Sequence, residues 1–84
     1  MIYILEFYES YHPMEKGQEV YTDAFSSLEN AITIASEYII EEEGEAYLKK
    51  TAMIYKTKPT RDENGSIISE KESLVREYSL TIEQ

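Results

Sequence analysis

The chain of 84 residues contains no cysteine, so it can form neither a disulfide nor a thiolate metal site. That absence is compatible with a reducing cytosol. Long apolar runs are also missing: the longest covers residues 1–5, whereas a membrane-spanning helix needs roughly 20 apolar residues. The same run is too short for a secretory signal and lacks a basic leader. We therefore expect a cytoplasmic protein with no membrane segment.

Residues that usually carry catalysis or bind metals are equally scarce. His12 is the only histidine, whereas a catalytic zinc site commonly uses about three protein ligands. The three glycines are explained by turns and a helix cap, so they do not indicate a phosphate-binding loop. The glutamates of residues 41–45 could offer oxygen ligands to Ca²⁺ or Mg²⁺, but they lack the spacing of a calcium loop. We expect a protein that is not an enzyme and that holds no cofactor or metal.

Basic residues are rare in the first half of the chain. Residues 1–45 contain eleven Asp or Glu against the single Lys16, a net charge of −10, whereas residues 46–84 contain six against seven Lys or Arg, a net charge of +1. The two halves sum to the −9 of the whole chain. An acidic field repels nucleic acids and anionic lipids and attracts basic partners. Acidic residues can also serve only to keep a small domain soluble, and the sequence leaves both explanations open.

One segment has a clear helical pattern. Apolar residues recur at helical spacing from Leu28 through Ile32 to Ile39, which predicts an amphipathic helix over about residues 27–43. Its apolar stripe should pack on the rest of the protein.

Both ends of this helix have sequence signals. Ser26 followed three residues later by Glu29 matches a capping box, and Gly44 suits the left-handed position after a last turn. The glutamates of residues 41–43 would then crowd the end where the helix dipole is already negative, an unfavourable placement by a few tenths to about 1 kcal/mol each. Local conflicts of this kind often mark functional residues.

Four segments have the alternation or composition of strands: residues 2–9, 18–24, 47–58 and 74–82. The first is apolar on both faces, as in an interior strand, and the second would return antiparallel to it. Residues 59–72 are polar around Asn64-Gly65, a strong type I′ hairpin signal, and we expect a projecting, partly disordered arm there. The sequence therefore predicts a single α+β domain over residues 1–84, with one amphipathic helix packed on a mostly antiparallel four-stranded sheet in the order β-β-α-β-β.

Tyrosine is unusually frequent, with eight residues against two phenylalanines. Tyrosine is enriched at protein interfaces because it combines a large contact area with a polar tip. A thin domain can also need aromatic side chains that are only half buried, and the sequence does not separate these two explanations. The three tyrosines that border the first loop are the best candidates to face a partner: Tyr8, Tyr11 and Tyr21.

The strand-to-helix junction F-S-S-L-E at residues 25–29, behind the opening M-I-Y-I-L at residues 1–5, resembles that of small, functionally unassigned proteins encoded by bacteriophages and mobile elements. The resemblance covers about residues 1–45 and carries no catalytic positions. It implies that the chain inhibits host defence or host transcription, as small acidic phage proteins often do, in some cases by mimicking DNA.

We therefore predict a non-catalytic acidic module that occupies a basic, nucleic-acid-binding groove of a host or defence protein without binding nucleic acid itself. Its expected contacts combine the acidic end of the helix with the tyrosines beside the first loop: Glu37, Glu41, Glu42, Glu43, Glu45, Tyr8, Tyr11 and Tyr21. The alternative is a homo-oligomer, in the simplest case a homodimer, that assembles through tyrosine-rich strand edges.

Overall fold

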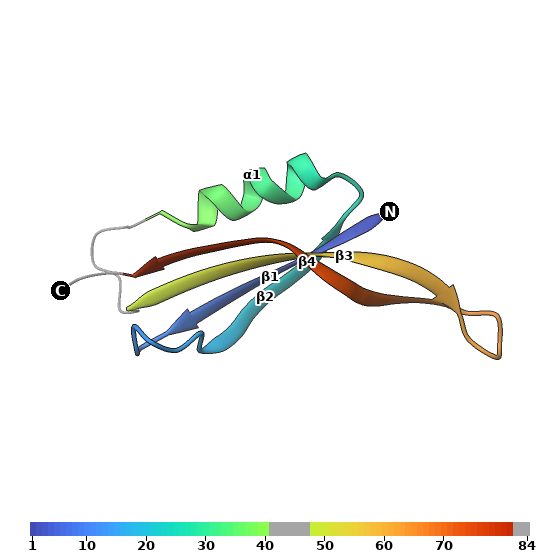
Figure 1. Ribbon diagram of the computed structural model, residues 1–84, viewed down its shortest axis with the longest axis horizontal. Helices are drawn as coiled ribbons and strands as arrows, with labels where there is room; N and C mark the ends of the chain where they lie inside the picture. Colours follow the sequence, from blue (N-terminus) through green and yellow to red (C-terminus); the bar gives the residue numbers. More distant parts are fainter. Residues whose placement is uncertain (41–47, 82–84) are drawn as a thin grey trace.

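The computed structural model describes residues 1–40 and 48–81. Its elements follow one another as β1 (Ile2–Ser10), β2 (Gln18–Phe25), α1 (Leu28–Tyr38), β3 (Lys49–Arg61) and β4 (Ile67–Thr81). The strands form one sheet in the order β2-β1-β3-β4, with every neighbouring pair antiparallel. Figure 1 shows α1 lying along one face of this sheet. The predicted α+β class, with one helix and an antiparallel sheet, is confirmed.

β1 is an interior strand between β2 and β3, as its apolar character on both faces predicts. The register places Leu5 opposite Ile54 and Phe7 opposite Ala52 of β3. All four side chains are buried in the core that α1 covers. Successive side chains of a strand point to opposite faces, so Glu6 lies on the other face of the sheet, which we call the open face.

Two alanines let α1 approach the sheet closely. Ala31 and Ala35 are fully buried, with 0% exposure, and share one core cluster with the apolar residues of β1 and β3. The longer side chains of Leu28, Ile32 and Ile39 are partly buried against the same cluster. The predicted apolar stripe of the helix is therefore confirmed.

The predicted start of the helix is wrong by one residue. The N-cap is Ser27, whose side-chain oxygen accepts a hydrogen bond from the backbone N–H of Asn30 at 3.4 Å. Both Ser26 and Ser27 have the chemistry of a cap, and only the backbone geometry selects the second. Because the cap falls later, Glu29 is not at the third helical position that a capping box requires.

The predicted end of the helix at residue 43 is also wrong, because α1 ends at Tyr38. The ammonium group of Lys50 on β3 donates a hydrogen bond to the Ile40 carbonyl oxygen at 3.2 Å, which places a positive charge near the negative end of the helix dipole. The expected conflict of the glutamates at residues 41–43 with the helix dipole stays untested. These residues and Gly44 lie outside the described residues.

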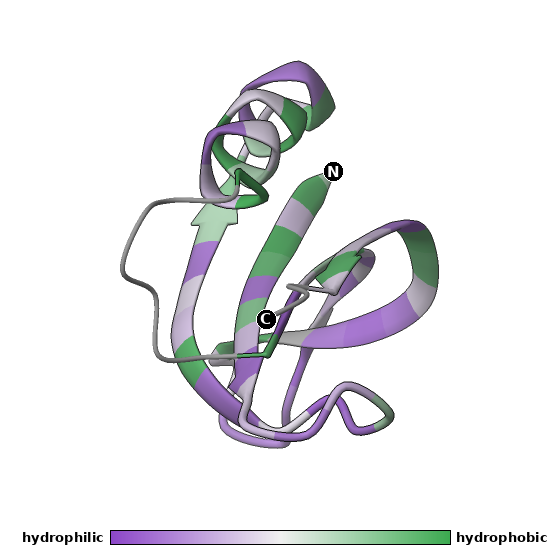
Figure 2. Cartoon of the chain, turned by 90° about the vertical axis from the view of Figure 1, so that its left-hand side faces the viewer, coloured by the Kyte–Doolittle hydropathy of each residue, from purple (hydrophilic) through white to green (hydrophobic). Residues whose placement is uncertain are grey.

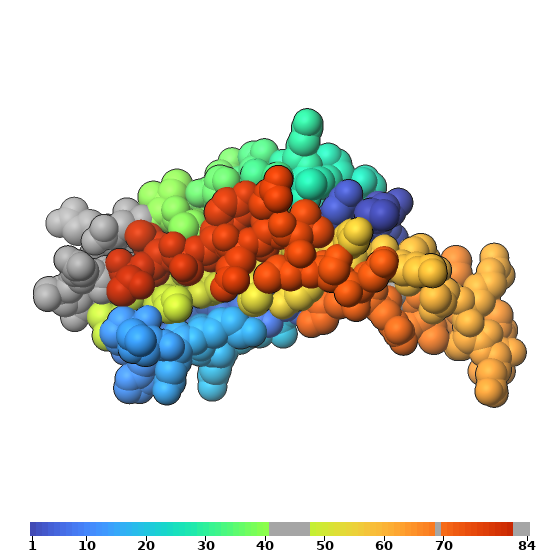
Figure 3. Space-filling model, in the orientation of Figure 1, coloured from blue at the N-terminus to red at the C-terminus, as the bar shows by residue number. Residues whose placement is uncertain are grey.

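β3 and β4 form a long ribbon that extends past the helix. Their register runs from Lys49 opposite Thr81 to Arg61 opposite Ile67. Figures 1 and 3 show this ribbon projecting from the part of the sheet that α1 covers, and the molecule measures 51 × 23 × 17 Å. Residues 59–72, where the sequence indicates a polar arm, thus contain paired strand on both sides of a turn. Partial disorder of this arm stays a prediction.

The turn at the tip of the ribbon is not the predicted type I′ turn. Gly65 has a φ of +82°, but no described non-glycine residue has a positive φ, so Asn64 does not take the left-handed conformation that a type I′ turn needs. Asp62 holds the turn instead. Its carbonyl accepts from the Gly65 N–H at 3.0 Å, and its carboxylate accepts from the N–H groups of Asn64 and Ser66, each at 2.9 Å.

The sheet is curled, as Figure 2 shows. Val75 and Glu72 of β4 have no partner in the register with β3, and such bulges increase the local twist. The open face lies inside the curl, because Lys71 of β4 reaches Glu6 of β1 across the intervening strand β3, at 3.0 Å. Polar side chains on this face are consequently buried although no helix covers them, and these are Glu6, Ser10, Thr51 and Thr57.

Candidate functional site

The three tyrosines predicted to face a partner do not form one surface. Tyr21 lies on the helix side, where its ring stacks on that of Phe7 with centroids 5.2 Å apart. Tyr8 lies on the open face and donates a hydrogen bond to Glu6 Oε1 at 2.8 Å. Tyr11 is in the loop after β1, and its side chain is 63% exposed. Of the three, the structure presents Tyr11 most openly to a partner.

The predicted acidic contact set is only partly described. Glu37 is exposed on α1. The remaining members, Glu41, Glu42, Glu43 and Glu45, lie outside the described residues. Of the predicted glutamates the structure therefore places only Glu37, and the role of the set in binding stays a prediction.

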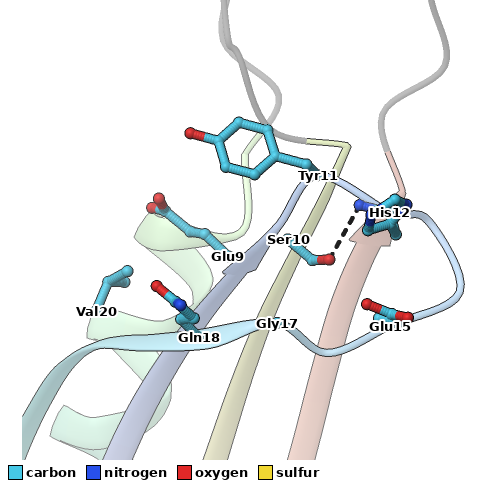
Figure 4. A pocket seen from close by; sticks show the side chains of 8 residues that line it. All are labelled: Glu9, Ser10, Tyr11, His12, Glu15, Gly17, Gln18 and Val20. Atoms are coloured by element: carbon cyan, nitrogen blue, oxygen red, sulfur yellow. Dashed lines mark hydrogen bonds between the residues drawn. The ribbon is translucent and has the colours of Figure 1, made fainter.

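A pocket of about 330 Å³ opens at the turn between β1 and β2. Figure 4 shows the side chains around it, which come from the end of β1, the loop and the start of β2. They combine two carboxylates, one exposed aromatic ring, an imidazole, small polar groups and one aliphatic side chain: Glu9, Ser10, Tyr11, His12, Glu15, Gly17, Gln18 and Val20.

The backbone of the loop explains why a pocket forms there. Gly17 has a φ of +83°, and a Cβ at this position would overlap the carbonyl oxygen of Glu9. Only glycine allows the two ends of the turn to approach this closely. At the other end, the Ser10 side-chain oxygen accepts from the His12 N–H at 3.0 Å, and the His12 carbonyl accepts from the Glu15 N–H at 3.2 Å. These bonds hold His12 and Glu15 at the rim.

Two of the side chains that line the pocket, Glu9 and Glu15, are carboxylates. The Glu9 carboxylate accepts a hydrogen bond from the Tyr38 hydroxyl through Oε1 at 2.8 Å, and a carboxylate retains further acceptor capacity. Glu15 is exposed. No lysine or arginine is among the described residues that line the pocket. The Tyr11 ring, whose side chain is 63% exposed, lines the same pocket, and the face of an aromatic ring attracts cations.

Sequence reasoning missed Glu9, Glu15 and Gln18 as site residues. Glu9 follows the alternation of β1, and the loop of residues 10–17 has no recognisable motif. The one available signal is Gly17 in a loop between two strands, which indicates a close backbone approach but does not reveal which side chains meet there.

A second polar cluster lies on the open face. The Lys71 ammonium contacts Glu6 Oε2 at 3.0 Å and lies 4.8 Å from the centre of the Tyr55 ring. The Lys16 ammonium lies 4.2 Å from the centre of the Tyr8 ring. Lys71 belongs to β4 and Lys16 to the β1–β2 loop, so the cluster ties both segments to the middle of the sheet.

The electrostatics of this cluster are those of a satisfied ion pair. Burial alone would raise the pKa of the Glu6 carboxyl, but hydrogen bonds from Tyr8 and Lys71, together with the charges of Lys71 and Lys16, lower it below its ordinary value. The same contacts act on Lys71, whose pKa is raised by its hydrogen bond to Glu6. A carboxylate that stays ionised and paired is suited to holding structure rather than to acid–base catalysis.

Residues 1–40 and 48–81 contain no group of three or more His, Cys, Asp or Glu that could hold a metal ion. The helix found in those two ranges is too short to span a membrane. Comparisons with protein-family models, with curated proteins and with solved structures found no match.

Proposed function

We propose that the chain is a non-catalytic binding module for a basic protein partner, and that a lysine or arginine side chain of this partner enters the pocket at the β1–β2 turn. The observation that carries the proposal is the composition of the pocket. Glu9, Glu15 and Tyr11 supply two negative charges and an exposed ring, and the described lining includes no Lys or Arg. Lysine and arginine side chains fit such a site because both carry a cation on a long apolar stem.

The charge of the surrounding surface supports the same partner. Residues 1–40 contain seven Asp or Glu against the single Lys16, whose ammonium lies over the Tyr8 ring on the open face. Glu19 and Asp23 are exposed along the edge strand β2, which leads away from the pocket. A partner approaching this edge therefore meets an acidic field, which speeds association and selects for basic surfaces.

The finer form of the proposal concerns the kind of partner. A nucleic-acid-binding groove of a host or defence protein presents closely spaced lysines and arginines, the side chains that the pocket and its acidic surroundings would accept. The glutamates at residues 41–45 would extend the acidic contact beyond the pocket, and the chain would then act as an inhibitor in the cytoplasm of a bacterial host. Self-association is favoured by a different observation, the outer edge of β4, and does not use the pocket.

The proposal is tested by titrating the isotopically labelled protein with a short arginine-rich peptide and following backbone amide signals by NMR. We expect the shifts to concentrate between Glu9 and Val20. Glu15→Gln should weaken binding about two- to fivefold, the usual worth of one exposed charge pair. Glu63→Gln is the matched control, because it removes the same charge at the tip of the ribbon, outside the pocket lining. Shifts spread evenly over all acidic residues, or equal effects of the two variants, would contradict the pocket assignment.

A further inference from the structure

β4 is a long edge strand whose outer side has no described partner. It covers 15 residues and is last in the sheet order β2-β1-β3-β4. Within residues 1–40 and 48–81 its only strand partner is β3. Figure 3 shows β4 exposed along much of the side facing the viewer. Apolar side chains on it are exposed too, at Ile67, Ile68 and Leu74. Strands of this kind readily pair with another chain.

We propose that β4 pairs antiparallel with β4 of a second copy of this chain, around a two-fold axis at Leu74. The charge pattern of β4 is the reason to expect a second copy of the same strand as its partner. With Leu74 opposite itself, Lys71 lies opposite Glu77 and Glu72 lies opposite Arg76, and symmetry repeats each pair. Ile68 then lies opposite Leu80. Opposite charges and apolar residues that face each other across an antiparallel pair stabilise it.

Neighbouring registers are less favourable. If the axis lies at Ser73, only Glu70 and Arg76 come opposite each other as an ion pair, and Lys71 faces Val75. If it lies at Val75, no oppositely charged residues of β4 come opposite each other. The register centred on Leu74 is thus selected by four charge pairs per dimer.

The bulges of β4 are consistent with this register. Residues that meet around a two-fold axis perpendicular to a sheet must lie on the same face. Lys71 is opposite Thr57 and Glu77 is opposite Met53, two β3 residues four positions apart and therefore on one face. One residue without a register partner lies on each side of Leu74, Glu72 before it and Val75 after it. Each bulge shifts the alternation of side chains by one residue, so Lys71 and Glu77 lie on the same face as each other. The same holds for Ile68 and Leu80, whose β3 partners Thr60 and Lys50 are ten positions apart.

The other edge of the sheet does not suit a second copy. β2 carries Glu19 and Asp23 and no basic residue. Two β2 strands centred on Tyr21 would place Glu19 against Asp23, which repel each other. Contact of β2 with β4 of another copy would be head-to-tail and would lead to an open chain of molecules instead of a closed dimer. β4 is therefore the edge through which a closed dimer can form, and β2 with its adjoining pocket remains exposed in that dimer.

Charge reversal at one pair tests the proposal. Arg76→Glu places two glutamates against each other on both sides of the two-fold axis, and Glu72→Arg does the same with two arginines. Each should raise the dissociation constant of the dimer about tenfold or more, and the double variant should restore it to within about threefold. Sedimentation equilibrium measures the constants, and circular dichroism checks that each variant is folded. A parent chain that stays monomeric at about 1 mM, or a double variant as weak as the singles, would overturn the proposal.

The register is tested independently by cross-linking, which the absence of cysteine makes simple. In the register centred on Leu74, the two cysteines of Leu74→Cys lie opposite each other, with the Cα–Cα distance of about 4–7 Å that a disulfide needs. A short thiol cross-linker should therefore join most of the dimer. Ile68→Cys is the matched control, because residue 68 of one copy lies opposite residue 80 of the other. Equal cross-linking of the two variants would exclude the Leu74 axis. Neither substitution touches the pocket, so binding of the arginine-rich peptide should be unchanged.

Discussion

Gly17 is the residue on which the shape of the pocket depends most. It has a positive φ, and a side chain there would collide with the backbone of Glu9. Gly65 has nearly the same φ, but a Cβ at that position would meet nothing within 4 Å. Both glycines therefore need a positive φ, and only Gly17 also lies so close to the backbone of another residue that a side chain would not fit.

This difference predicts unequal costs for the same substitution. Gly65→Ala should lower the free energy of unfolding by about 1 kcal/mol, the cost of placing a Cβ in the left-handed region. Gly17→Ala should lower it by about 2 kcal/mol or more, because the backbone of the turn must also move. Urea unfolding of both variants measures the difference. Equal costs would mean that the close approach of Gly17 to β1 does not exist in solution.

Glu6 links acidity to stability through its ion pair with Lys71. Its pKa in the folded protein lies below the ordinary value, so the paired carboxylate stabilises the fold at neutral pH, and this contribution is lost as the pH falls through the folded-state pKa. Glu6→Gln should lower the free energy of unfolding at pH 7 by about 1–3 kcal/mol, towards the low end because the Lys71 side chain is 47% exposed and can be rehydrated.

The pH dependence separates this role from a simple packing defect. Between about pH 5 and pH 3 the thermal midpoint of the parent should fall more steeply than that of Glu6→Gln, because the variant has no carboxylate to protonate at this position. The exposed Glu63→Gln serves as the control and should follow the parent. Parallel pH profiles for the parent and Glu6→Gln would show that the ion pair contributes nothing to stability.

At the scale of elements, α1 is held by the close approach of its alanines to β1 and β3. Ala35 has 0% exposure, whereas its neighbour Ser36 points to solvent. Ala35→Leu should therefore destabilise the protein by about 1–3 kcal/mol through overpacking, and Ser36→Leu should change stability by less than about 0.5 kcal/mol. Thermal unfolding compares them. A tolerated Ala35→Leu would mean that the helix packs on the sheet through another face.

The elements that the sequence predicted well are those set by local side-chain periodicity. The apolar faces of β1 and the stripe from Leu28 to Ile39 are visible in the sequence because burial follows a period of two or of 3.6 residues. The end of α1 at Tyr38 is not visible, because the apolar period continues through Ile39 and Ile40. The sequence also does not reveal that β4 begins at Ile67 instead of residue 74, because the first half of the strand is polar and pairs with β3 through its backbone.

The same reasoning explains what was missed in the site. Tyr8, Tyr11 and Tyr21 are close in sequence, but strand alternation and the loop send them to three different surfaces. The pocket depends on Gly17 meeting Glu9, a backbone contact across the turn that no side-chain pattern reports. Only the exposure of Tyr11, a loop residue, could have been predicted from the sequence.

At the scale of the whole molecule, the two edges of the sheet differ in chemistry. β2 is acidic and adjoins the pocket, whereas β4 alternates acidic and basic residues and can match its own sequence. The first suits a basic partner and the second suits another copy of the chain. A dimer through β4 would carry two exposed pockets, which would strengthen binding to a partner with repeated basic sites.

The central claim is that the acidic pocket binds a basic partner, and the most direct test is the affinity for the arginine-rich peptide at two ionic strengths, about 0.05 M and about 0.3 M. Calorimetry on the parent, on Glu15→Gln and on Glu63→Gln gives both the dissociation constants and their dependence on salt. We expect the parent to bind more weakly at the higher salt, Glu15→Gln to bind more weakly than the parent with a flatter salt dependence, and Glu63→Gln to match the parent. A parent that shows no binding at low salt, or a Glu15→Gln variant that matches the parent in both affinity and salt dependence, would contradict the account.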